Sequence, residues 1–238
     1  MEEIFTRGIK PFPLGVGFRN KKRIRNFEKS KGSMSLNVVI VADGTFPEHP
    51  IPLGYLKNAD MIICCDGSAE NLIKANMIPD AIVGDMDSLS DKLAKKFADR
   101  IYKDEDQETN DLTKAVKWCH ESGHNDLIIV GATGKREDHT IGNISLLTVY
   151  SEYVNVKMVT DTGIFLPFQK SCKIESFPGQ QVSIFSINPE TKITSTGLRY
   201  PLNNRKLKNW WEASLNEAAG KVIELIFSGG PVLVFLEF

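Results

Sequence analysis

Two carboxylates, Asp85 and Asp87, stand two residues apart, just after the short apolar run of residues 81–83. In an extended chain this spacing places both side chains on one side. There they repel each other unless a cation lies between them or one is protonated. Oxygen ligands with no neighbouring His or Cys are typical of Mg²⁺ rather than Zn²⁺. The pair is therefore a candidate magnesium site, with a solvated acidic turn as the alternative interpretation.

A second group of carboxylates fills residues 104–111, directly before a helix predicted over 110–121. Thr109 or Asn110 is suited to cap that helix, and acidic residues near a helix start complement its dipole. Asp111 is in addition a candidate third ligand. Three carboxylates would complete a magnesium site that keeps room for water and phosphate oxygens.

A glycine-rich segment, Gly131-Ala132-Thr133-Gly134-Lys135-Arg136-Glu137-Asp138-His139, follows a predicted strand and opens a predicted helix. Glycines let backbone N–H groups approach phosphates, and a helix N-terminus favours anions. Arg136 is suited to bidentate binding of phosphate oxygens. Asp138 either caps the helix or orients Arg136 or a metal-bound water. His139 is either a base or a structural residue. The segment lacks the Gly-x4-Gly-Lys-[Ser/Thr] spacing of a Walker A motif.

The elements that must position these residues alternate between apolar strands and amphipathic helices. Strands are predicted over 36–42, 61–65, 81–83 and 127–130, and helices over 68–77, 90–98, 110–121 and 138–150. This alternation predicts a mostly parallel sheet covered by helices on both faces.

Ligands of such sheets bind beyond the carboxyl ends of the strands. The strand endings Asp43-Gly44 and Asp66-Gly67 are therefore expected on the same edge as Asp85 and Gly131. Asp66 is either a helix cap or a ligand of the ribose or the metal.

Beyond residue 155 the pattern changes to short alternating runs separated by Gly, Pro, Asn and Asp. Strands are predicted over 156–160, 163–168, 172–177, 181–187, 192–195, 222–228 and 232–238. This spacing indicates an all-β sandwich or barrel. The predicted organisation is a poorly ordered basic extension (1–33), an α/β nucleotide-binding catalytic domain (34–153) and a C-terminal β-sandwich domain (154–238).

Composition is 42% hydrophobic and 25% charged, which is ordinary for a soluble globular protein. No run approaches the roughly 18 apolar residues that span a membrane, and no apolar stretch indicates a secretory signal. Residues 1–33 carry nine Lys and Arg against three Asp and Glu, whereas residues 34–238 carry 20 against 27. The acidic body argues against broad nucleic-acid binding. Four cysteines without metal or disulfide spacing fit a reducing cytoplasm.

The order and spacing of these motifs resemble those of the thiamin pyrophosphokinase family. The matching motifs are Asp66-Gly67, Pro79-Asp80-x3-Gly84-Asp85-x-Asp87-Ser88, Gln107-x3-Asp111, Gly131-Ala132-x-Gly134-x-Arg136-x-Asp138-His139, Gly197-Leu198-x-Tyr200-Pro201-Leu202 and Asn216-Glu217. Three positions depart from the family pattern: Ser68 replaces a Gly, Asn110 a Thr, and Leu215 a Ser.

The resemblance implies an enzyme that moves pyrophosphate from ATP to the hydroxyl of thiamine and releases AMP. It also implies a homodimer with thiamine at the subunit interface. Mg²⁺ is then expected on Asp85, Asp87 and Asp111, with Arg136 as a further catalytic residue. The nucleotide-binding candidates are Asp43, Asp66, Gly67, Gly131, Thr133, Gly134, Arg136, Asp138 and His139, and the substrate-binding candidates are Gln107, Ser214 and Asn216.

Trp210 and Trp211 are aromatic candidates for the thiamine pocket, or else core or interface residues. Three other functions remain open from the residues alone. They are a Mg²⁺-dependent phosphohydrolase, a pyrophosphokinase that acts on another small alcohol, and a non-catalytic nucleotide-sensing module.

Overall fold

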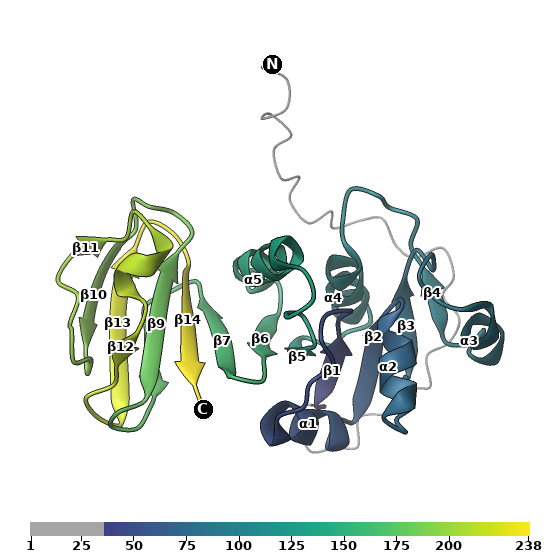
Figure 1. Ribbon diagram of the computed structural model, residues 1–238. Coiled ribbons are helices and arrows are strands. Elements are labelled where there is room, and N and C mark those ends of the chain that lie inside the picture. Colours follow the sequence, from purple (N-terminus) through teal and green to yellow (C-terminus); the bar gives the residue numbers. More distant parts are fainter. Residues whose placement is uncertain (1–35) are drawn as a thin grey trace, which may run out of the picture.

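The α/β half of the chain forms one layer of parallel strands with helices on both sides (Figure 1). The computed structural model describes residues 36–238, so the basic extension predicted over 1–33 lies outside the described residues. In chain order the elements of this half are β1 (Val38–Val41), α1 (Pro50–Lys57), β2 (Met61–Cys65), α2 (Ser68–Lys74), β3 (Ala81–Gly84), α3 (Asp91–Lys96), β4 (Ile101–Lys103), α4 (Asp111–Glu121), β5 (Asp126–Val130), α5 (Glu137–Tyr150) and β6 (Asn155–Val159).

Strand β1 lies in the middle of the parallel strands, between β2 and β5. All four of its side chains are buried, as the continuous apolar run predicted. Val38 and Ile40 belong to the core that contains residues of α4 and α5. Val39 and Val41 belong to the core that contains residues of α1 and α2. Alternate residues of one strand therefore hold helices on opposite faces of the sheet, which confirms the predicted layers.

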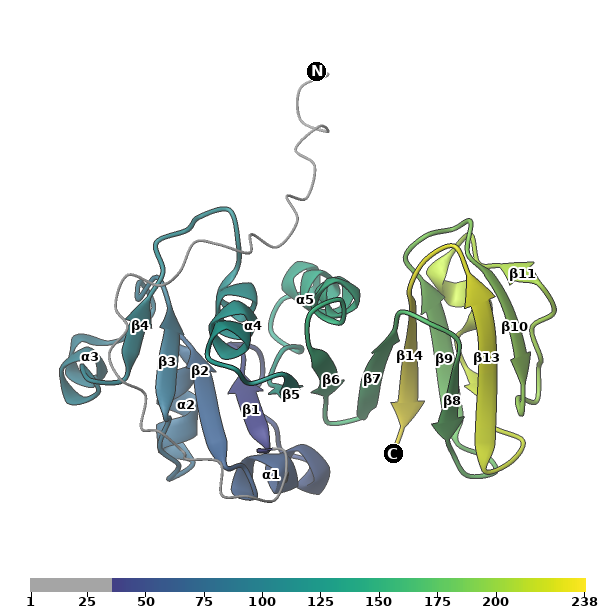
Figure 2. The ribbon, with the colours of Figure 1, turned by 180° about the vertical axis from the view of Figure 1, so that it is seen from behind.

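The C-terminal half is a β-sandwich, as predicted. Its elements are β7 (Gly163–Phe168), β8 (Cys172–Glu175), β9 (Gln181–Ser186), β10 (Lys192–Thr196), β11 (Arg205–Lys206), the 3-10 helix η1 (Trp210–Ala213), β12 (Asn216–Glu217), β13 (Val222–Ser228) and β14 (Val232–Glu237). One sheet has the order β11-β10-β13-β8. It packs against β9 and β14 through a shared apolar core (Figure 2).

The two halves share one ten-stranded sheet, of order β12-β9-β14-β7-β6-β5-β1-β2-β3-β4. Strand β6 pairs in parallel with β5, and β7 then pairs antiparallel with both β6 and β14. The change of direction thus falls between β6 and β7, after the division predicted at 153/154. That division stays a prediction. No helix within residues 36–238 has the length and apolar character to cross a bilayer.

Candidate active site

The predicted strand endings meet along one edge of the sheet. The loop after β1 contacts the loop after β5, since Gly44 N donates to Gly131 O at 2.6 Å. Next to it, Asp66 follows β2 and its N–H donates to Val83 O of β3 at 3.0 Å. Parallel strands bring their carboxyl ends together, so residues far apart in the sequence become neighbours here.

Three carboxylates converge at this edge. Asp66, Asp85 and Asp87 each offer an oxygen that lies within 4.8 Å of the oxygens offered by the other two. The chain between Asp85 and Asp87 is not extended, so the condition under which the spacing predicted both side chains on one side is not met. Met86 has a φ of 70°, and Asp87 N donates to Asp85 Oδ1 at 3.3 Å. A tight turn, closed by the first carboxylate, brings the second one beside it.

Asp66 is the most buried of the three, with 2% of the residue exposed. Its Oδ2 accepts a hydrogen bond from Ser88 N at 3.0 Å, whereas its buried Oδ1 has no hydrogen-bond partner among the described residues. Burial, together with the neighbouring Asp111 and Asp87, raises the pKa of Asp66 to about 6. The helix-cap alternative for Asp66 is wrong, because the N-cap of α2 is Gly67.

Gly84 makes room for this arrangement at the end of β3. A Cβ at this position would lie 2.9 Å from Asp66 Cβ and 3.1 Å from Asp111 Oδ1. Any larger residue would push the two carboxylates apart. The glycine is therefore explained by the close approach of acidic side chains rather than by a turn.

Asp111, the predicted third ligand, is the first residue of α4 and contacts the cluster through a lysine. Lys114 Nζ lies 3.1 Å from Asp111 Oδ1 and 3.6 Å from Asp85 Oδ2. The Lys114 side chain is only 2% exposed. Gln107 Nε2 also donates to Asp85 Oδ2, at 3.3 Å. Sequence reasoning missed Lys114, although its place one helical turn after Asp111 was a usable signal.

The charges of this cluster act on one another. Burial raises the pKa of Asp111, and the Lys114 ammonium opposes this rise without cancelling it. Burial also acts to raise the pKa of Asp85. There the hydrogen bond from the Asp87 N–H and the charge of Lys114 outweigh it, so the pKa of Asp85 is lowered. The lysine thus favours the ionised form of both carboxylates.

Three of the four other acidic residues at 104–108 have side-chain partners, and Glu108 takes part through its backbone N–H. Asp104 accepts from Asp106 N at 3.1 Å, Asp106 accepts from Glu108 N at 2.9 Å, and Glu105 pairs with Lys103. Asn110 caps α4 by accepting from Thr113 N at 2.9 Å, as one of the two sequence alternatives predicted. The density of carboxylates in this segment is therefore explained mainly by loop turns.

The glycine-rich segment packs closely on the loop after β1. Gly134 has a φ of 94°, and a Cβ there would lie 2.5 Å from Thr45 Oγ1. Its N–H donates to Thr140 Oγ1 at 3.3 Å, and Thr133 O accepts from Thr45 N at 2.8 Å. Lys135 Nζ pairs with Asp43 Oδ1 at 2.8 Å. Two candidate residues for nucleotide binding, Asp43 and Gly134, therefore lie in one pair of packed loops.

Arg136 and Asp138 form a bidentate pair at the start of α5. Arg136 Nε and Nη2 donate to the two carboxylate oxygens at 3.0 Å and 2.6 Å. This pairing lowers the pKa of Asp138 to about 2. Arg136 occupies the N-cap position, so the cap alternative for Asp138 is wrong and the arginine-orienting alternative is confirmed. The side chain of the adjacent His139 is exposed.

Asn143 joins the two parts of the site. From α5 its Nδ2 donates to Ala132 O at 2.9 Å, in the glycine-rich segment. Its Oδ1 accepts from Asn110 Nδ2 at 3.2 Å, one residue before Asp111. No pattern in the sequence singles out this residue.

The two substrate-binding candidates of the β-sandwich have partners inside this subunit. Asn216 is 4% exposed. Its Oδ1 accepts a hydrogen bond from Tyr200 N at 3.1 Å, and its Nδ2 donates to Tyr200 O at 2.7 Å. Ser214 Oγ donates to Trp211 O at 2.8 Å. Trp211 itself is 73% exposed, so the core alternative for this residue is wrong.

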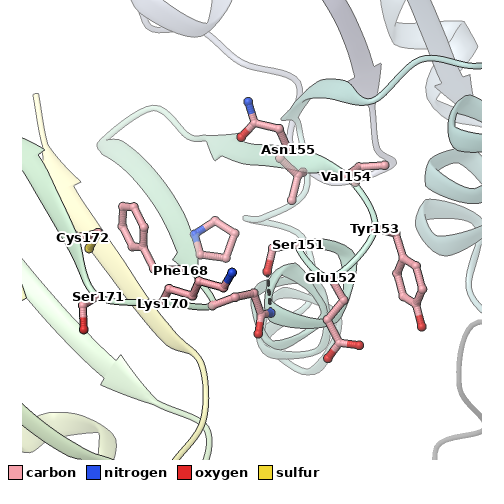
Figure 3. A pocket seen from close by; sticks show the side chains of 12 residues that line it. Ser151, Glu152, Tyr153, Val154, Asn155, Phe168, Lys170, Ser171 and Cys172 are labelled. Carbon is pink, nitrogen blue, oxygen red and sulfur yellow. Dashed lines mark hydrogen bonds between the residues drawn. The ribbon is translucent and has the colours of Figure 1, made fainter. Parts of the chain in front are cut away.

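A groove lies at the other end of α5, and none of its lining residues belongs to the candidate site (Figure 3 shows the groove). It is lined by residues 151–156 and 167–172. Gln169 Nε2 closes part of it by donating to Thr148 O at 2.6 Å and to Ser151 Oγ at 2.9 Å. Helix α5 has 14 residues, so the groove lies about 20 Å along the helix from Arg136.

A parallel α/β sheet with acidic and glycine-rich loops at its carboxyl edge, joined to a β-sandwich, is an arrangement typical of proteins that bind phosphate groups at that edge. Residues 53–159 match the family model described as thiamin pyrophosphokinase, catalytic domain, and residues 163–235 match thiamin pyrophosphokinase, substrate-binding domain. The chain belongs to the thiamin pyrophosphokinase family, which confirms the resemblance found in the sequence.

Individual relatives agree with this assignment. Thiamine pyrophosphokinase of Bacillus subtilis is 33% identical over 184 residues, which cover 69% of this chain and 81% of the relative. Thiamine pyrophosphokinase 1 of rice (Oryza sativa subsp. japonica) is 28% identical over 179 residues, covering 63% of this chain and 68% of the relative.

Solved structures show the same fold. The crystal structure of the Bacillus subtilis thiamine pyrophosphokinase superposes with a TM-score of 0.69 at 24% identity, covering 84% of this chain and 98% of that one. Thiamin pyrophosphokinase from Candida albicans gives a TM-score of 0.70 at 20% identity, covering 85% and 90%.

Proposed function

We propose that this protein is a thiamine pyrophosphokinase. It transfers a pyrophosphoryl group from ATP to the hydroxyl of thiamine, giving thiamine diphosphate and AMP. Family models for both the catalytic and the substrate-binding domain support this function. The matches give no support to a phosphohydrolase or a nucleotide sensor. The structural observation that carries the proposal is the meeting of Asp66, Asp85 and Asp87 at one edge of the sheet.

These residues fit a hard divalent cation. Within residues 36–238 the buried Asp66 Oδ1 has no hydrogen-bond partner, and an ionised oxygen in that state is costly unless a cation satisfies it. Carboxylate oxygens are the donors that Mg²⁺ prefers. We place the ion between Asp66, Asp85 and Asp87, with the predicted ligand Asp111 beside them. When bound, Mg²⁺ would neutralise charge on the phosphate oxygens.

The other residues of the edge position the triphosphate. Arg136 offers a planar pair of donors to phosphate oxygens, and the backbone of residues 131–134 lies beside it. Gln107 is held against Asp85, where it can contact the acceptor substrate. The thiamine hydroxyl then attacks the β-phosphorus in line. Such transfers depend on positioning and on charge stabilisation more than on covalent help from the protein.

The β-sandwich supplies the thiamine site and the subunit contact of a homodimer. The family model over residues 163–235 is described as substrate-binding, which supports the first assignment. Tyr200, Trp211 and Leu215 are 62%, 73% and 78% exposed. Ser214 bonds Trp211 and Asn216 bonds Tyr200, so the three side chains come from one region, and a group of exposed apolar side chains supports a binding surface. The cysteines at 64, 65, 119 and 172 are free thiols, which fits a cytoplasmic location.

The dimer proposal predicts that Trp211→Ala shifts the protein toward monomers at micromolar concentration. Analytical ultracentrifugation measures this directly. Phe177→Ala, which removes another half-exposed aromatic of the β-sandwich, is the matched control. A wild-type protein that sediments as a monomer at every concentration would contradict the dimer.

The activity test is an assay of the products formed from ATP, with and without thiamine. The wild type is expected to make AMP and thiamine diphosphate only when thiamine is present. Release of ADP and free phosphate would point instead to a phosphohydrolase, and absence of AMP with thiamine present would leave a pyrophosphokinase that acts on another small alcohol. Asp85→Asn is expected to fold and to lose this activity, whereas Glu105→Gln, which alters an exposed carboxylate paired with Lys103, is expected to keep it. Wild-type turnover by Asp85→Asn would refute the metal assignment.

A further inference from the structure

Lys114 is a buried cation within a cluster of carboxylates. Its side chain is 2% exposed, and its ammonium reaches Asp111 Oδ1 at 3.1 Å and Asp85 Oδ2 at 3.6 Å. Lysine is almost never fully buried unless its charge is paired. A leucine or methionine would fill the same space on α4 without the cost of removing an ammonium from water. The charge itself therefore calls for an explanation.

The pairing divides the oxygens of the cluster into two sets. Lys114 contacts Asp111 and the Oδ2 atom of Asp85. The other set contains the unpartnered Oδ1 of Asp66. Asp87 also lacks a contact with the lysine among the interactions that the structure gives. One side of the cluster is thus neutralised from within the protein, and the other side is left to an external cation.

We propose that Lys114 is a positioning residue, an internal counter-charge that holds Asp85 and Asp111 in place while no divalent cation is bound. It directs the cation to the side of Asp85 that faces Asp66 and Asp87. This inference rests on the proposed function, because it presupposes a cation at the same edge. The carboxylates of Asp66, Asp85, Asp87 and Asp111 repel one another when all are ionised. A fixed ammonium keeps this group together without closing the side that must accept Mg²⁺.

A purely structural role for Lys114 makes a different prediction. If the lysine only ties α4 to the end of β3, its loss lowers stability by the same amount with and without Mg²⁺. If it is a counter-charge, its loss leaves excess negative charge, which a divalent cation can neutralise in its place. Stability then becomes dependent on Mg²⁺.

The test compares Lys114→Met with the wild type by thermal unfolding, in EDTA and in millimolar Mg²⁺ without nucleotide, at constant ionic strength. We expect Lys114→Met to have a lower Tm than the wild type in EDTA. Addition of Mg²⁺ should raise the Tm of Lys114→Met more than it raises the Tm of the wild type. With saturating Mg²⁺ its kcat should still be lower by roughly 10-fold or more, because Asp111 is no longer held. An equal increase in Tm on addition of Mg²⁺ in the two proteins would overturn the proposal.

Lys157→Met is the matched control. Lys157 Nζ bonds the Tyr55 hydroxyl at 3.1 Å and lies over its ring, away from the carboxylates. Loss of this lysine should lower the Tm equally in EDTA and in Mg²⁺. A Mg²⁺ gain as large as that of Lys114→Met would show that the effect is not specific to the cluster, and would also overturn the proposal.

A double variant covers the case in which Lys114→Met does not fold. Lys114→Met with Asp111→Asn removes a charge of each sign and should fold, with a Tm above that of Lys114→Met alone. If the double variant also fails to fold, even in Mg²⁺, the lysine is needed for packing and the counter-charge role is wrong.

The outcomes separate this inference from the proposed function. An active wild type that gains nothing from Mg²⁺ in thermal unfolding would overturn the role of Lys114 and leave the activity standing. A wild type that makes no AMP, with Lys114→Met still showing the larger Mg²⁺ gain, would overturn the activity alone.

Discussion

The acidic and the cationic parts of the site are built in different ways. Asp66 and Lys114 are buried, and their positions are fixed by strand ends and by α4. Arg136 and Asp138 have side chains that are 68% and 60% exposed, and they pair with each other across two residues of one helix start. The acidic part is therefore prepared by the fold itself. The cationic part is held by a local pair on the surface, and the proposed function requires a phosphate to replace the carboxylate as the partner of the arginine.

The strongest test of this comparison is Asp66→Asn. If the acidic part is prepared for a cation, loss of one ligand charge should lower kcat/KM by at least about 100-fold. Stability in EDTA should rise, since the unpartnered buried charge is gone. Activity assays and thermal unfolding measure the two effects. Asp80→Ala is the control, because Asp80 accepts from Ile62 N at 2.9 Å at the opposite edge, so its loss should cost stability and spare activity.

The pH dependence of stability sharpens the same point. The pKa of Asp66 is raised from its ordinary value of 3.8 to about 6. Between these values the folded protein keeps a proton that the unfolded chain has lost. The stabilisation of the folded state by the protonated Asp66 is therefore complete below pH 3.8 and is lost as pH rises through about 6. In EDTA, the Tm of the wild type should fall relative to that of Asp66→Asn as pH rises across this range. If the difference in Tm between the wild type and Asp66→Asn did not change with pH, Asp66 would not be a buried carboxylate without a bound cation.

A smaller effect is expected from Arg136→Lys in the cationic part. Lysine keeps the charge but cannot bind two oxygens in one plane. The KM for ATP should rise by roughly 10-fold, with little change in stability, because the pair with Asp138 is exposed. Steady-state kinetics and thermal unfolding test this. Arg100→Lys, at an arginine that bonds Pro79 O far from the site, should leave the KM unchanged. A large loss of stability in Arg136→Lys would show that the cationic part, like the acidic part, is built into the fold and is not only a local pair on the surface.

Much of the fold followed from apolar runs and their endings. The run at Met61–Cys65 was predicted to the residue, because all five side chains are buried and the pattern is continuous. Helix α1 was missed because its first residues include Pro50 and Pro52, which resemble a loop. Proline is tolerated in the first turn of a helix, where its missing N–H has no partner to lose. Strand β4, with three residues, is too short to give a pattern.

The site was predicted less completely, for reasons of geometry. Strand endings placed Asp66 and Asp85 on one edge, but no pattern shows that Met86 takes a positive φ and turns Asp87 back. Burial of Lys114 depends on the packing of α4 against the sheet, which the sequence around it does not reveal. In the β-sandwich, the polarity of Asn216 suggested a ligand contact, whereas its amide is bonded to the backbone of Tyr200.

The smallest predicted effect concerns the link between the two parts. Asn143→Ala removes two hydrogen bonds, one to Ala132 O and one from Asn110, each worth about 1 kcal/mol. We expect kcat/KM to fall by a few-fold, because the glycine-rich segment and the start of α4 lose their common anchor. The KM for ATP and the Mg²⁺ concentration needed for half-maximal activity should rise together.

Asn155→Ala is the matched control for this link. Asn155 donates to Asp126 Oδ1 at 2.9 Å, at the start of β5 and β6 and so at the opposite edge of the sheet. It should lose less stability than Asn143→Ala, because one side-chain hydrogen bond is removed instead of two, and it should keep full activity. If Asn143→Ala changed only the KM for ATP, the two parts would be independent of each other. A joint change would mean that the exposed cationic part takes its position from the buried acidic part.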